Sequence, residues 1–208
     1  MQRILIVDDH PLYRAGLMGA LRAQLADVEL LGADSAEDGL RILEEAPEAD
    51  LVLLDLRLPG MDGFEALSVY GARFPMVPRV LVSGSDEAPH VKRAFDLGAS
   101  GFLPKSLSVT EFSAAIQLVL AGGVYVPGHA AAEDAPAPDS LTVRQVEVLH
   151  LLAEGYTNKE IAKSLDITER TAKAHVRAIF VALGAENRTQ AVVNAQRLGH
   201  LSTARQRA

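Results

Sequence analysis

The chain contains no cysteine, and this absence rules out two kinds of structure at once. Without thiols there are no disulfide bonds and no thiolate metal site, which fits the reducing cytoplasm. The chain also lacks any run of about 18 apolar residues, so no segment is suited to cross a membrane as a helix. Since no basic segment, apolar stretch and cleavage site precede the first predicted strand, we expect a cytoplasmic protein that is not exported.

Basic residues are scarce in the first part of the chain, and acidic residues are scarce in the last part. Residues 1–125 hold 10 Lys or Arg against 18 Asp or Glu, whereas residues 140–208 hold 10 against 6. A basic part has the right sign to bind a polyanion such as DNA. Because 208 residues suit two modest domains, this asymmetry predicts two domains with different tasks.

Two hydrophobic periodicities alternate along the first part of the chain. Short runs rich in Ile, Val and Leu predict strands that are buried on both faces. The stretches between them have apolar residues at every third or fourth position, as amphipathic helices do. Strand–helix alternation repeated five times predicts a five-stranded parallel sheet covered by helices on both faces. The helices are expected near residues 12–25, 36–43, 64–70, 91–97 and 112–120.

The composition changes near residue 125. Gly122 and Gly123 predict the end of the first domain, and the following stretch is rich in Ala, Pro and acidic residues with little to bury. We therefore predict a first domain over residues 1–124, a linker over 125–139 and a second domain over 140–204.

The second domain has a helical pattern throughout. Two capping boxes begin at Thr142 and Thr157, and Thr168 can cap a third helix. A short helix, a turn of three or four residues and a longer helix form the helix-turn-helix pattern. The first, second and fourth helices are expected to begin at about Val143, Asn158 and Thr189. The third follows its cap at Thr168 and reaches Leu183, and the fourth reaches Leu198.

Four of the apolar runs of the first domain end on polar residues. Asp8 and Asp9 follow the first run, Asp55 follows the run at 51–54, and Ser83 and Lys105 follow the last two. In an open parallel sheet the carboxyl ends of the strands form the edge where ligands bind. We therefore expect three carboxylates, a hydroxyl and an ammonium to gather at one edge of the sheet.

Such a cluster suits a divalent cation and a phosphoryl group. Three neighbouring carboxylates repel one another unless a cation is bound, and Mg²⁺ prefers oxygen ligands. A carboxylate can attack phosphorus to give an acyl phosphate, and Lys105 and Ser83 could bind the phosphoryl oxygens. Each residue alone is more often a helix cap or a solvated side chain. Together, in this order along the chain, they favour the site.

The segments ILIVDDHP, LVLLDLRLPGMDG, VLVSGS and GASGFLPKS resemble the signature segments of response-regulator receiver domains. The resemblance implies a flavodoxin-like fold with strand order 2-1-3-4-5. It implies that Asp55 accepts a phosphoryl group from a histidine kinase. It also implies that Mg²⁺ is bound by Asp9, Asp55 and the main-chain carbonyl of Arg57, with Asp8 acting largely through water.

The same resemblance assigns three residues to phosphate pairing and switching. Ser83 matches the switch hydroxyl, Phe102 the rotating aromatic residue and Lys105 the phosphate-pairing lysine. The chain departs from the commoner pattern in having Ser rather than Thr at 83, Phe where other subfamilies have Tyr at 102, and Ser106 rather than Pro after the lysine. These departures leave the expected phosphorylation intact.

The stretch TERTAKAHVRAIFVAL predicts a recognition helix, which presents side chains to base edges and has cations nearby for phosphates. Taken alone, a small helical bundle with basic residues is more often a packing or partner domain. In this helix, His175 taken alone is expected to be a helix residue with a structural hydrogen bond rather than a ligand. The inner face would carry Ala172, Val176, Ile179 and Leu183. The residues expected at base edges are Lys173, Ala174 and Arg177, and those near phosphates are Lys159, Arg170 and Thr171.

The segment over residues 141–195 resembles the LuxR-type helix-turn-helix. It contains LT-x-R-x-x-EVL-x-LLAEG-x-TNKEIA followed by IT-x-RT-x-K-x-HV. In that family the recognition helix lies in the major groove and the last helix pairs two subunits. Val192 and Val193, with neighbouring Ala195, are therefore expected dimer contacts. Two alanines of the recognition helix replace the usual valines, which leaves the base preference open.

Together the two resemblances cover most of the chain and are those of the NarL/FixJ class of bacterial response regulators. They imply a transcription regulator, not an enzyme, that is phosphorylated on Asp55 by a histidine kinase. It would bind double-stranded promoter DNA as a homodimer, with RNA polymerase as a further partner.

Two other functions remain open at this point. The receiver could be a fixed protein-interaction surface in a DNA-binding regulator that does not respond to phosphorylation, in which case acetyl phosphate would add no mass at Asp55. An aspartyl-phosphate phosphatase of the haloacid-dehalogenase type is the other. It needs Asp-x-Asp after the first strand, where this chain has Asp8, Asp9 and His10.

Overall fold

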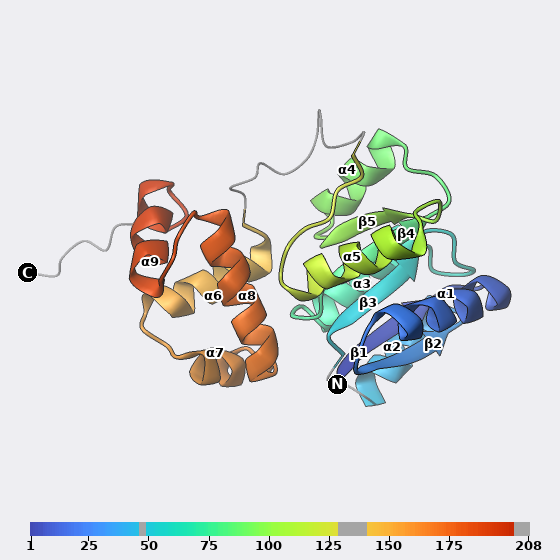
Figure 1. Cartoon of the computed structure of the whole chain (residues 1–208), viewed down its shortest axis with the longest axis horizontal. Helices are drawn as coiled ribbons and strands as arrows, with labels where there is room; N and C mark the ends of the chain where they lie inside the picture. Colours follow the sequence, from blue (N-terminus) through green and yellow to red (C-terminus); the bar gives the residue numbers. More distant parts are fainter. Residues whose placement is uncertain (46–48, 129–140, 202–208) are drawn as a thin grey trace, which may run out of the picture. The chain divides into compact units, whose positions relative to one another are not determined.

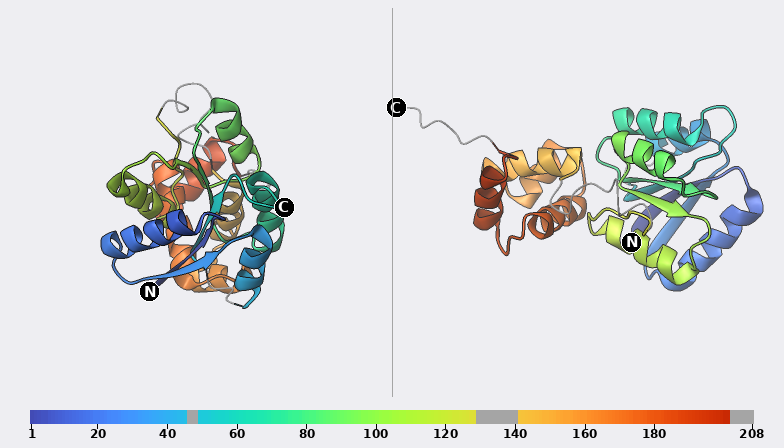
Figure 2. Two further views of the ribbon diagram at one scale, coloured as in Figure 1. Left: turned by 90° about the vertical axis from the view of Figure 1, so that its right-hand side faces the viewer. Right: turned by 90° about the horizontal axis from the view of Figure 1, so that it is seen from above.

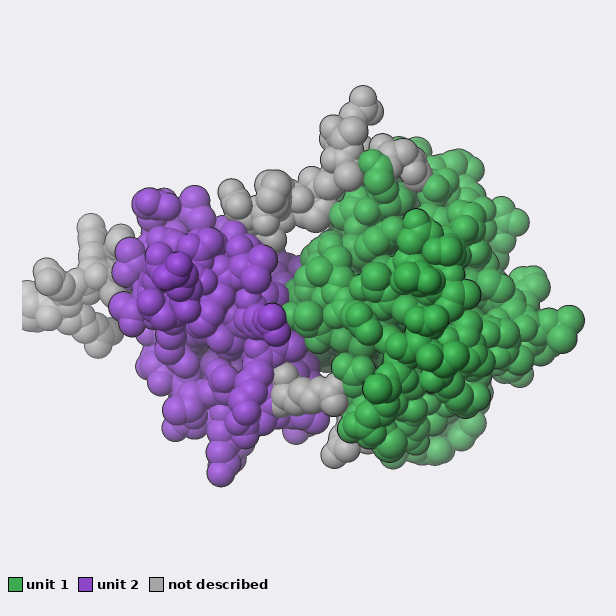
Figure 3. All heavy atoms as spheres, in the orientation of Figure 1, with its two compact units in different colours: residues 1–135 green, residues 136–208 purple. Residues whose placement is uncertain are grey.

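The computed structural model describes residues 1–45, 49–128 and 141–201 (Figure 1). The chain divides into two compact units, residues 1–135 and 136–208 (Figure 3). The predicted linker falls largely on residues outside the described ranges, and so does the predicted end of the second domain at 204. No helix within the described ranges has both the length and the apolar character that a membrane crossing requires.

Five parallel strands form the sheet of the first unit in the order β2-β1-β3-β4-β5, as predicted. Two of the three interior strands, β3 and β4, are buried along their whole length, which explains their continuous apolar runs. The strands are β1 (Gln2–Val7), β2 (Val28–Ala33), β3 (Leu51–Asp55), β4 (Arg79–Ser83) and β5 (Gly101–Pro104).

Helices cover both faces of this sheet (Figure 2). One apolar core lies between the sheet and α2, α3 and α4, and a second lies between the sheet and α1 and α5. The predicted capping box at Ser108 is present at the start of α5. The helices are α1 (Pro11–Gln24), α2 (Ala36–Glu45), α3 (Gly63–Arg73), α4 (Ala88–Asp96) and α5 (Val109–Leu120), so each of the five predicted helices is confirmed.

The chain that follows α5 returns along the outer edge of β5. The main-chain N–H of Phe102 donates to the oxygen of Tyr125 at 3.1 Å, and the N–H of Tyr125 donates to Ser100 at 3.2 Å. Phe102 is fully buried and belongs to the core under α2, α3 and α4. The outermost strand, whose C-terminal end leads to Lys105, is therefore held on both sides.

The second unit contains α6 (Val143–Ala153), α7 (Asn158–Ser164), α8 (Glu169–Ala182) and α9 (Arg188–Arg197). The capping boxes at Thr142 and Thr157 and the cap at Thr168 are confirmed. Asp166, with a φ of 53°, makes the tight turn between α7 and α8. The predicted helix-turn-helix is therefore present, and the inner face of α8 is buried as expected, with Ala172, Val176, Ile179 and Leu183 all 8% exposed or less.

Candidate functional site

Three of the predicted polar residues meet at the carboxyl edge of the sheet. Asp8 follows β1, Asp55 ends β3, and Lys105 follows β5. The ammonium Nζ of Lys105 lies 2.8 Å from Asp8 Oδ2 and 3.0 Å from Asp55 Oδ2. Asp8 and Asp55 are only 2% and 3% exposed. The arrangement confirms that these charged groups converge although up to 97 residues separate them in the chain.

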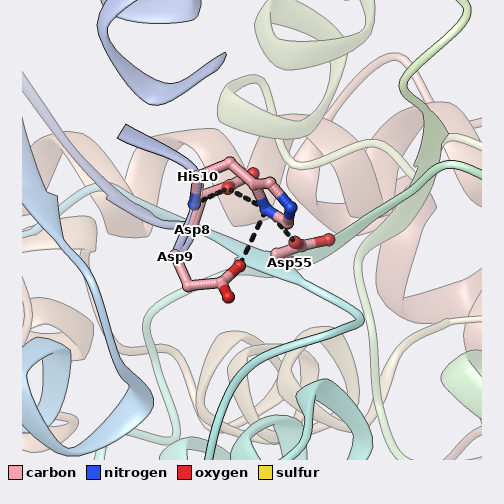
Figure 4. Close-up of side chains that lie close together, drawn as sticks. All are labelled: Asp8, Asp9, His10 and Asp55. Carbon is pink, nitrogen blue, oxygen red and sulfur yellow. Dashed lines mark hydrogen bonds and ion pairs between the residues drawn. The ribbon is translucent and has the colours of Figure 1, made fainter. Parts of the chain in front are cut away.

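A group of side chains that could hold a metal ion lies at the same edge. One ligand atom from each of Asp8, Asp9, His10 and Asp55 lies within 4.8 Å of the others (Figure 4). The imidazole Nδ1 of His10 lies between the carboxylates, 2.8 Å from Asp9 Oδ1, 3.3 Å from Asp8 Oδ1 and 3.9 Å from Asp55 Oδ2. The sequence interpretation assigned no role to His10, and its only sequence signal is its place directly after the two aspartates.

The residues present fit a divalent cation. Asp9 Oδ1 is buried and, among the described residues, accepts no hydrogen bond, although His10 Nδ1 is close to it. A buried carboxylate oxygen without a hydrogen bond is costly unless a cation satisfies it. Three carboxylates against the single ammonium of Lys105 also leave an excess of negative charge. Carboxylate oxygens are the ligands that hard divalent cations prefer.

The loop that follows β3 folds back tightly against the end of the strand. The N–H of Gly63 donates to the oxygen of Leu56 at 3.0 Å, and a Cβ at Gly63 would collide with the main-chain oxygen of Asp55. Glycine at the start of α3 therefore allows this close approach. The fold brings the loop containing Arg57 next to the carboxylate cluster, and the main-chain N–H of Arg57 donates a hydrogen bond to Asp55.

The electrostatic balance of the site is uneven. Burial raises the pKa of Asp55 above its usual value, the hydrogen bond and charge of Lys105 oppose this rise, and the charge of Asp8 adds to it. Burial alone would lower the pKa of Lys105, but its hydrogen bonds to Asp8 and Asp55 outweigh burial and raise it. Lys105 is therefore a firmly charged ammonium. A bound cation would favour the ionised form of Asp55, which is the nucleophilic form.

Two residues of α1 complete the site, and the sequence interpretation missed both. The ring centroid of Tyr13 lies 4.3 Å from the Nζ of Lys105. Burial, followed by the charges of Asp8 and Asp55, raises the pKa of Tyr13 to about 12. Arg14 donates from Nη1 to the main-chain oxygen of Asp8, and to that of Ala33 at 3.3 Å. These contacts fix the ends of β1 and β2 against the first turns of α1.

The hydroxyl of Ser83 makes no hydrogen bond to the carboxylates of this cluster among the described residues, and Phe102 lies in the apolar core. Ser83 is buried, and its Oγ accepts from the N–H of Ser85 at 3.1 Å. Within the described residues no hydrogen bond joins Ser83 to Asp55. The N–H of Lys105 donates to the main-chain oxygen of Ser83 at 2.6 Å, so the ends of β4 and β5 are linked directly.

The residues predicted to read DNA occupy the second unit. Lys173 and Arg177 are exposed on α8, and Ala174 between them is half-buried. Lys173 Nζ pairs with Glu169 Oε1 at 2.8 Å. Lys159 is exposed on α7. Thr171 is half-buried at the N-terminus of α8, where its N–H donates to Thr168 Oγ1, and Arg170 precedes it in the same helix.

Two expectations for the second unit are wrong. His175 is 6% exposed, and neither of its ring nitrogens has a hydrogen-bond partner among the described residues. Burial, followed by the charge of Arg144, lowers the pKa of His175 to about 4. Ala195 is fully buried within its own unit, because it belongs to the inward face of α9, so it is not a dimer contact. Val193 is 55% exposed and Val192 is half-buried.

Comparison with known proteins places these features in a family. Two family models match, the response regulator receiver domain over residues 4–117 and the bacterial regulatory proteins of the luxR family over residues 139–195. The glycerol metabolism activator of Pseudomonas putida is 34% identical over 94% of this chain and 95% of that protein. The transcriptional regulatory protein LiaR of Bacillus subtilis (strain 168) is 35% identical over 95% and 98%.

Among solved structures, the RcsB response regulator of Salmonella typhimurium has the same fold. The two chains superpose with a TM-score of 0.59 over 93% of this chain and 98% of that one, at 24% identity. The family matches span both units of the chain, and the relatives match it nearly end to end. The chain therefore belongs to the two-component response regulators of the NarL/FixJ class, which are not enzymes but DNA-binding transcription regulators with a receiver domain and a LuxR-type helix-turn-helix domain.

Proposed function

We propose that Asp55 is the phosphorylation site of this regulator and that a phosphohistidine of a histidine kinase is the donor. The observation that carries the proposal is the position of Lys105, whose ammonium lies 3.0 Å from Asp55 and 2.8 Å from Asp8. The carboxylate proposed to attack phosphorus is thus paired with a cation that could move to a phosphoryl oxygen after the transfer.

The transfer would proceed by nucleophilic attack. An Oδ of Asp55 attacks phosphorus while the P–N bond to the kinase imidazole breaks, and Asp55 becomes an acyl phosphate. The imidazole leaves with the electron pair of that bond and takes up a proton. Lys105 would then pair with the phosphoryl oxygens, and Ser83 would release Ser85 and donate its hydroxyl hydrogen to one of them.

The divalent cation proposed for this site is Mg²⁺. Asp8, Asp9, Asp55 and the main-chain carbonyl of Arg57 would hold it, with Asp8 acting largely through water. When bound, the ion would offset the negative charge of the phosphoryl group. The buried Asp9 oxygen without a hydrogen bond supports this assignment.

The conformational change caused by phosphorylation would be transmitted from the site through β4 and β5. Ser83 ends β4 and Lys105 directly follows β5, a main-chain hydrogen bond of 2.6 Å joins them, and Phe102 lies buried in β5. Movement of Ser83 and Lys105 towards a charged phosphoryl group would therefore reshape the surface next to both strands. Phe102 would respond by packing alone, because it has no phenol oxygen.

For the second unit we propose major-groove binding by α8. Lys173, Ala174 and Arg177 would contact base edges, because Arg and Lys pair with guanine and a methyl group can touch thymine. The exposure of both cations on one side of the helix supports this reading. The residues proposed to bind phosphates are Lys159, Arg170 and Thr171.

The last helix of the second unit, α9, is the proposed contact between two copies of the chain. Val192 and Val193 would contact a second copy of the chain, giving a homodimer on promoter DNA in the cytoplasm, with RNA polymerase as a further partner. The partial exposure of both valines supports their role. The proposed domain limits are residues 1–124 and 140–204, with the linker at 125–139. The family matches over 4–117 and 139–195 support a division into two domains, and the hydrogen bonds of Tyr125 to β5 attach the first residue of the proposed linker to the first domain.

Intact-mass measurement tests the phosphorylation proposal. Full-length protein incubated with acetyl phosphate and Mg²⁺ should gain the mass of one phosphoryl group, and Asp55→Asn should gain none. The same gain in Asp55→Asn would mean that another residue is the acceptor. No gain in the wild type would favour a receiver that acts as a fixed protein-interaction surface.

A further inference from the structure

Lys105 has a third contact besides the two carboxylates, and this contact carries no charge. The ring of Tyr13, in the first turn of α1, lies with its centroid 4.3 Å from the Nζ of Lys105. The face of an aromatic ring is negative and attracts a cation that lies over it within about 6 Å. Because the side chain of Lys105 is only 19% exposed, water screens this attraction little.

Both carboxylate contacts of Lys105 would change in the proposed phosphorylation, on which this inference rests. Asp55 becomes an acyl phosphate, and Asp8 would turn towards the cation. The ring of Tyr13 stays neutral throughout, since its pKa of about 12 lies far above the working pH. Tyr13 is therefore the contact of Lys105 that persists before and after the transfer.

We propose that Tyr13 is a positioning residue for phosphoryl transfer, whose ring face holds the Lys105 ammonium towards the oxygens of the incoming phosphoryl group. A lysine is a point charge on a flexible four-carbon chain, so its direction depends on what it touches. The helical turn that carries the ring is held in place. Its helix begins at Pro11, directly after the acidic cluster, and Arg14 ties the same helical turn to the main-chain oxygens of Asp8 and Ala33.

A simpler role for Tyr13 would be to fill space between α1 and the sheet edge. The two roles differ in what they require of the side chain. Packing needs apolar bulk, which Tyr13→Leu largely keeps. Positioning needs the ring face but not the hydroxyl. Because the hydroxyl makes no hydrogen bond to any of the described residues, Tyr13→Phe should preserve the positioning of Lys105.

The test is a double-mutant cycle on the full-length chain, with acetyl phosphate and Mg²⁺ and with intact mass as the readout. In this reaction Asp55 attacks phosphorus, the P–O bond to acetate breaks, and acetate leaves with the electron pair. We expect Tyr13→Leu to take up phosphate roughly three- to tenfold more slowly than the wild type, and Tyr13→Phe to restore most of the rate. In a Lys105→Ala background, Tyr13→Leu should have no further effect, because it acts through the ammonium.

A second readout does not depend on phosphorylation. The chain has only five lysines, so the side-chain NMR signals of isotope-labelled lysine can be resolved. Protons that lie over an aromatic face resonate upfield. The Hε signal of Lys105, identified by its loss in Lys105→Ala, should be shifted upfield in the wild type and in Tyr13→Phe. The shift should disappear in Tyr13→Leu.

The outcomes separate this inference from the proposed function. Equal rates in the wild type and Tyr13→Leu, or the same slowing with and without Lys105, would overturn the role of Tyr13. If the wild type is phosphorylated but its Lys105 signal is not shifted, the role of Tyr13 is overturned and the phosphorylation proposal stands. If the signal is shifted but the wild type gains no phosphoryl group, the phosphorylation proposal is wrong and the role of Tyr13 in transfer falls with it.

Discussion

The receiver site and the recognition helix hold their functional side chains in opposite ways. At the receiver edge, Asp8 and Asp55 are almost fully buried and Lys105 bridges them. On α8, Lys173 and Arg177 are exposed, and only the opposite face of the helix is packed. Water and salt screen the exposed charges on α8 but hardly reach the buried charges at the receiver edge. Loss of the buried Lys105 charge should therefore lower the stability of the receiver, whereas loss of Lys173 or Arg177 on α8 should change only contacts with DNA.

The comparison is sharpest for two lysines that both pair with carboxylates. Lys105→Ala leaves Asp8 and Asp55 buried side by side, and we expect the receiver to lose about 3 kcal/mol of unfolding free energy in the absence of divalent cations. Lys173→Ala removes only an exposed pair with Glu169 and should leave stability unchanged. Denaturant unfolding with a chelator measures both. Equal losses for the two lysines would remove the distinction, and Mg²⁺ should restore part of the loss at Lys105 alone.

The second unit also contains a buried titratable side chain, His175, whose protonation should change the stability of the domain. His175 has a folded-state pKa of about 4, below its unfolded value of about 6.5. Its neutral form therefore stabilises the domain fully above pH 6.5, and this contribution is lost as the pH falls towards 4. At pH 5 the loss should be about 2 kcal/mol.

Hydrogen exchange of α8 peptides at pH 7 and pH 5, corrected for the intrinsic exchange rates, measures that loss. His175→Leu should abolish the part of the pH dependence that belongs to α8. Exchange of the receiver peptides serves as the internal control. An unchanged pH dependence in His175→Leu would show that another group titrates.

On α8 the expected effect appears in DNA binding. Arg177→Ala should weaken binding to a promoter fragment roughly tenfold, because a side chain at a base edge contributes about 1–3 kcal/mol of discrimination. Arg197→Ala, which removes the same charge from α9, is the matched control and should weaken binding less. Titration at several salt concentrations measures both. Equal losses would indicate that the charge, not the position on the recognition helix, matters.

The smallest effect is expected at His10. Its Nδ1 lies 2.8 Å from Asp9 Oδ1, the oxygen proposed to bind Mg²⁺. Because the imidazole competes for this oxygen, His10→Ala should bind Mg²⁺ a few times more tightly. Isothermal titration with Mg²⁺ measures the affinity. Weaker Mg²⁺ binding in His10→Ala would instead show that the imidazole contributes to binding the cation.

Most of the fold could be predicted, because its central strands and helix starts depend on local signals. β3 and β4 are buried on both faces and read as continuous apolar runs, and the capping boxes at Thr142 and Thr157 locate two helices. The edge strand β2 is different. Its sequence VELLGA is buried at only two of six positions. The alternation of strands and helices therefore implied this strand, but no continuous apolar run located it.

The site residues that lie at strand ends could be predicted from the sequence. Those whose contacts depend on how helices pack against the sheet could not. Asp55 ends β3, and Asp8 and Lys105 directly follow the parallel strands β1 and β5, so their convergence follows from the topology. The contact of Tyr13 with Lys105 depends on how α1 packs against the sheet, which no local pattern reports. The same limit applies to His175, whose burial depends on the packing of α8 within its unit.

The central claim is that phosphorylation of Asp55 controls DNA binding. Its most direct test is the genome-wide recovery of DNA fragments bound by the wild type and by Asp55→Ala in cells that contain the active kinase. The account predicts that a defined set of promoter fragments is bound by the wild type and strongly depleted in Asp55→Ala at equal protein levels. The same fragments bound to the same extent by both proteins would contradict it.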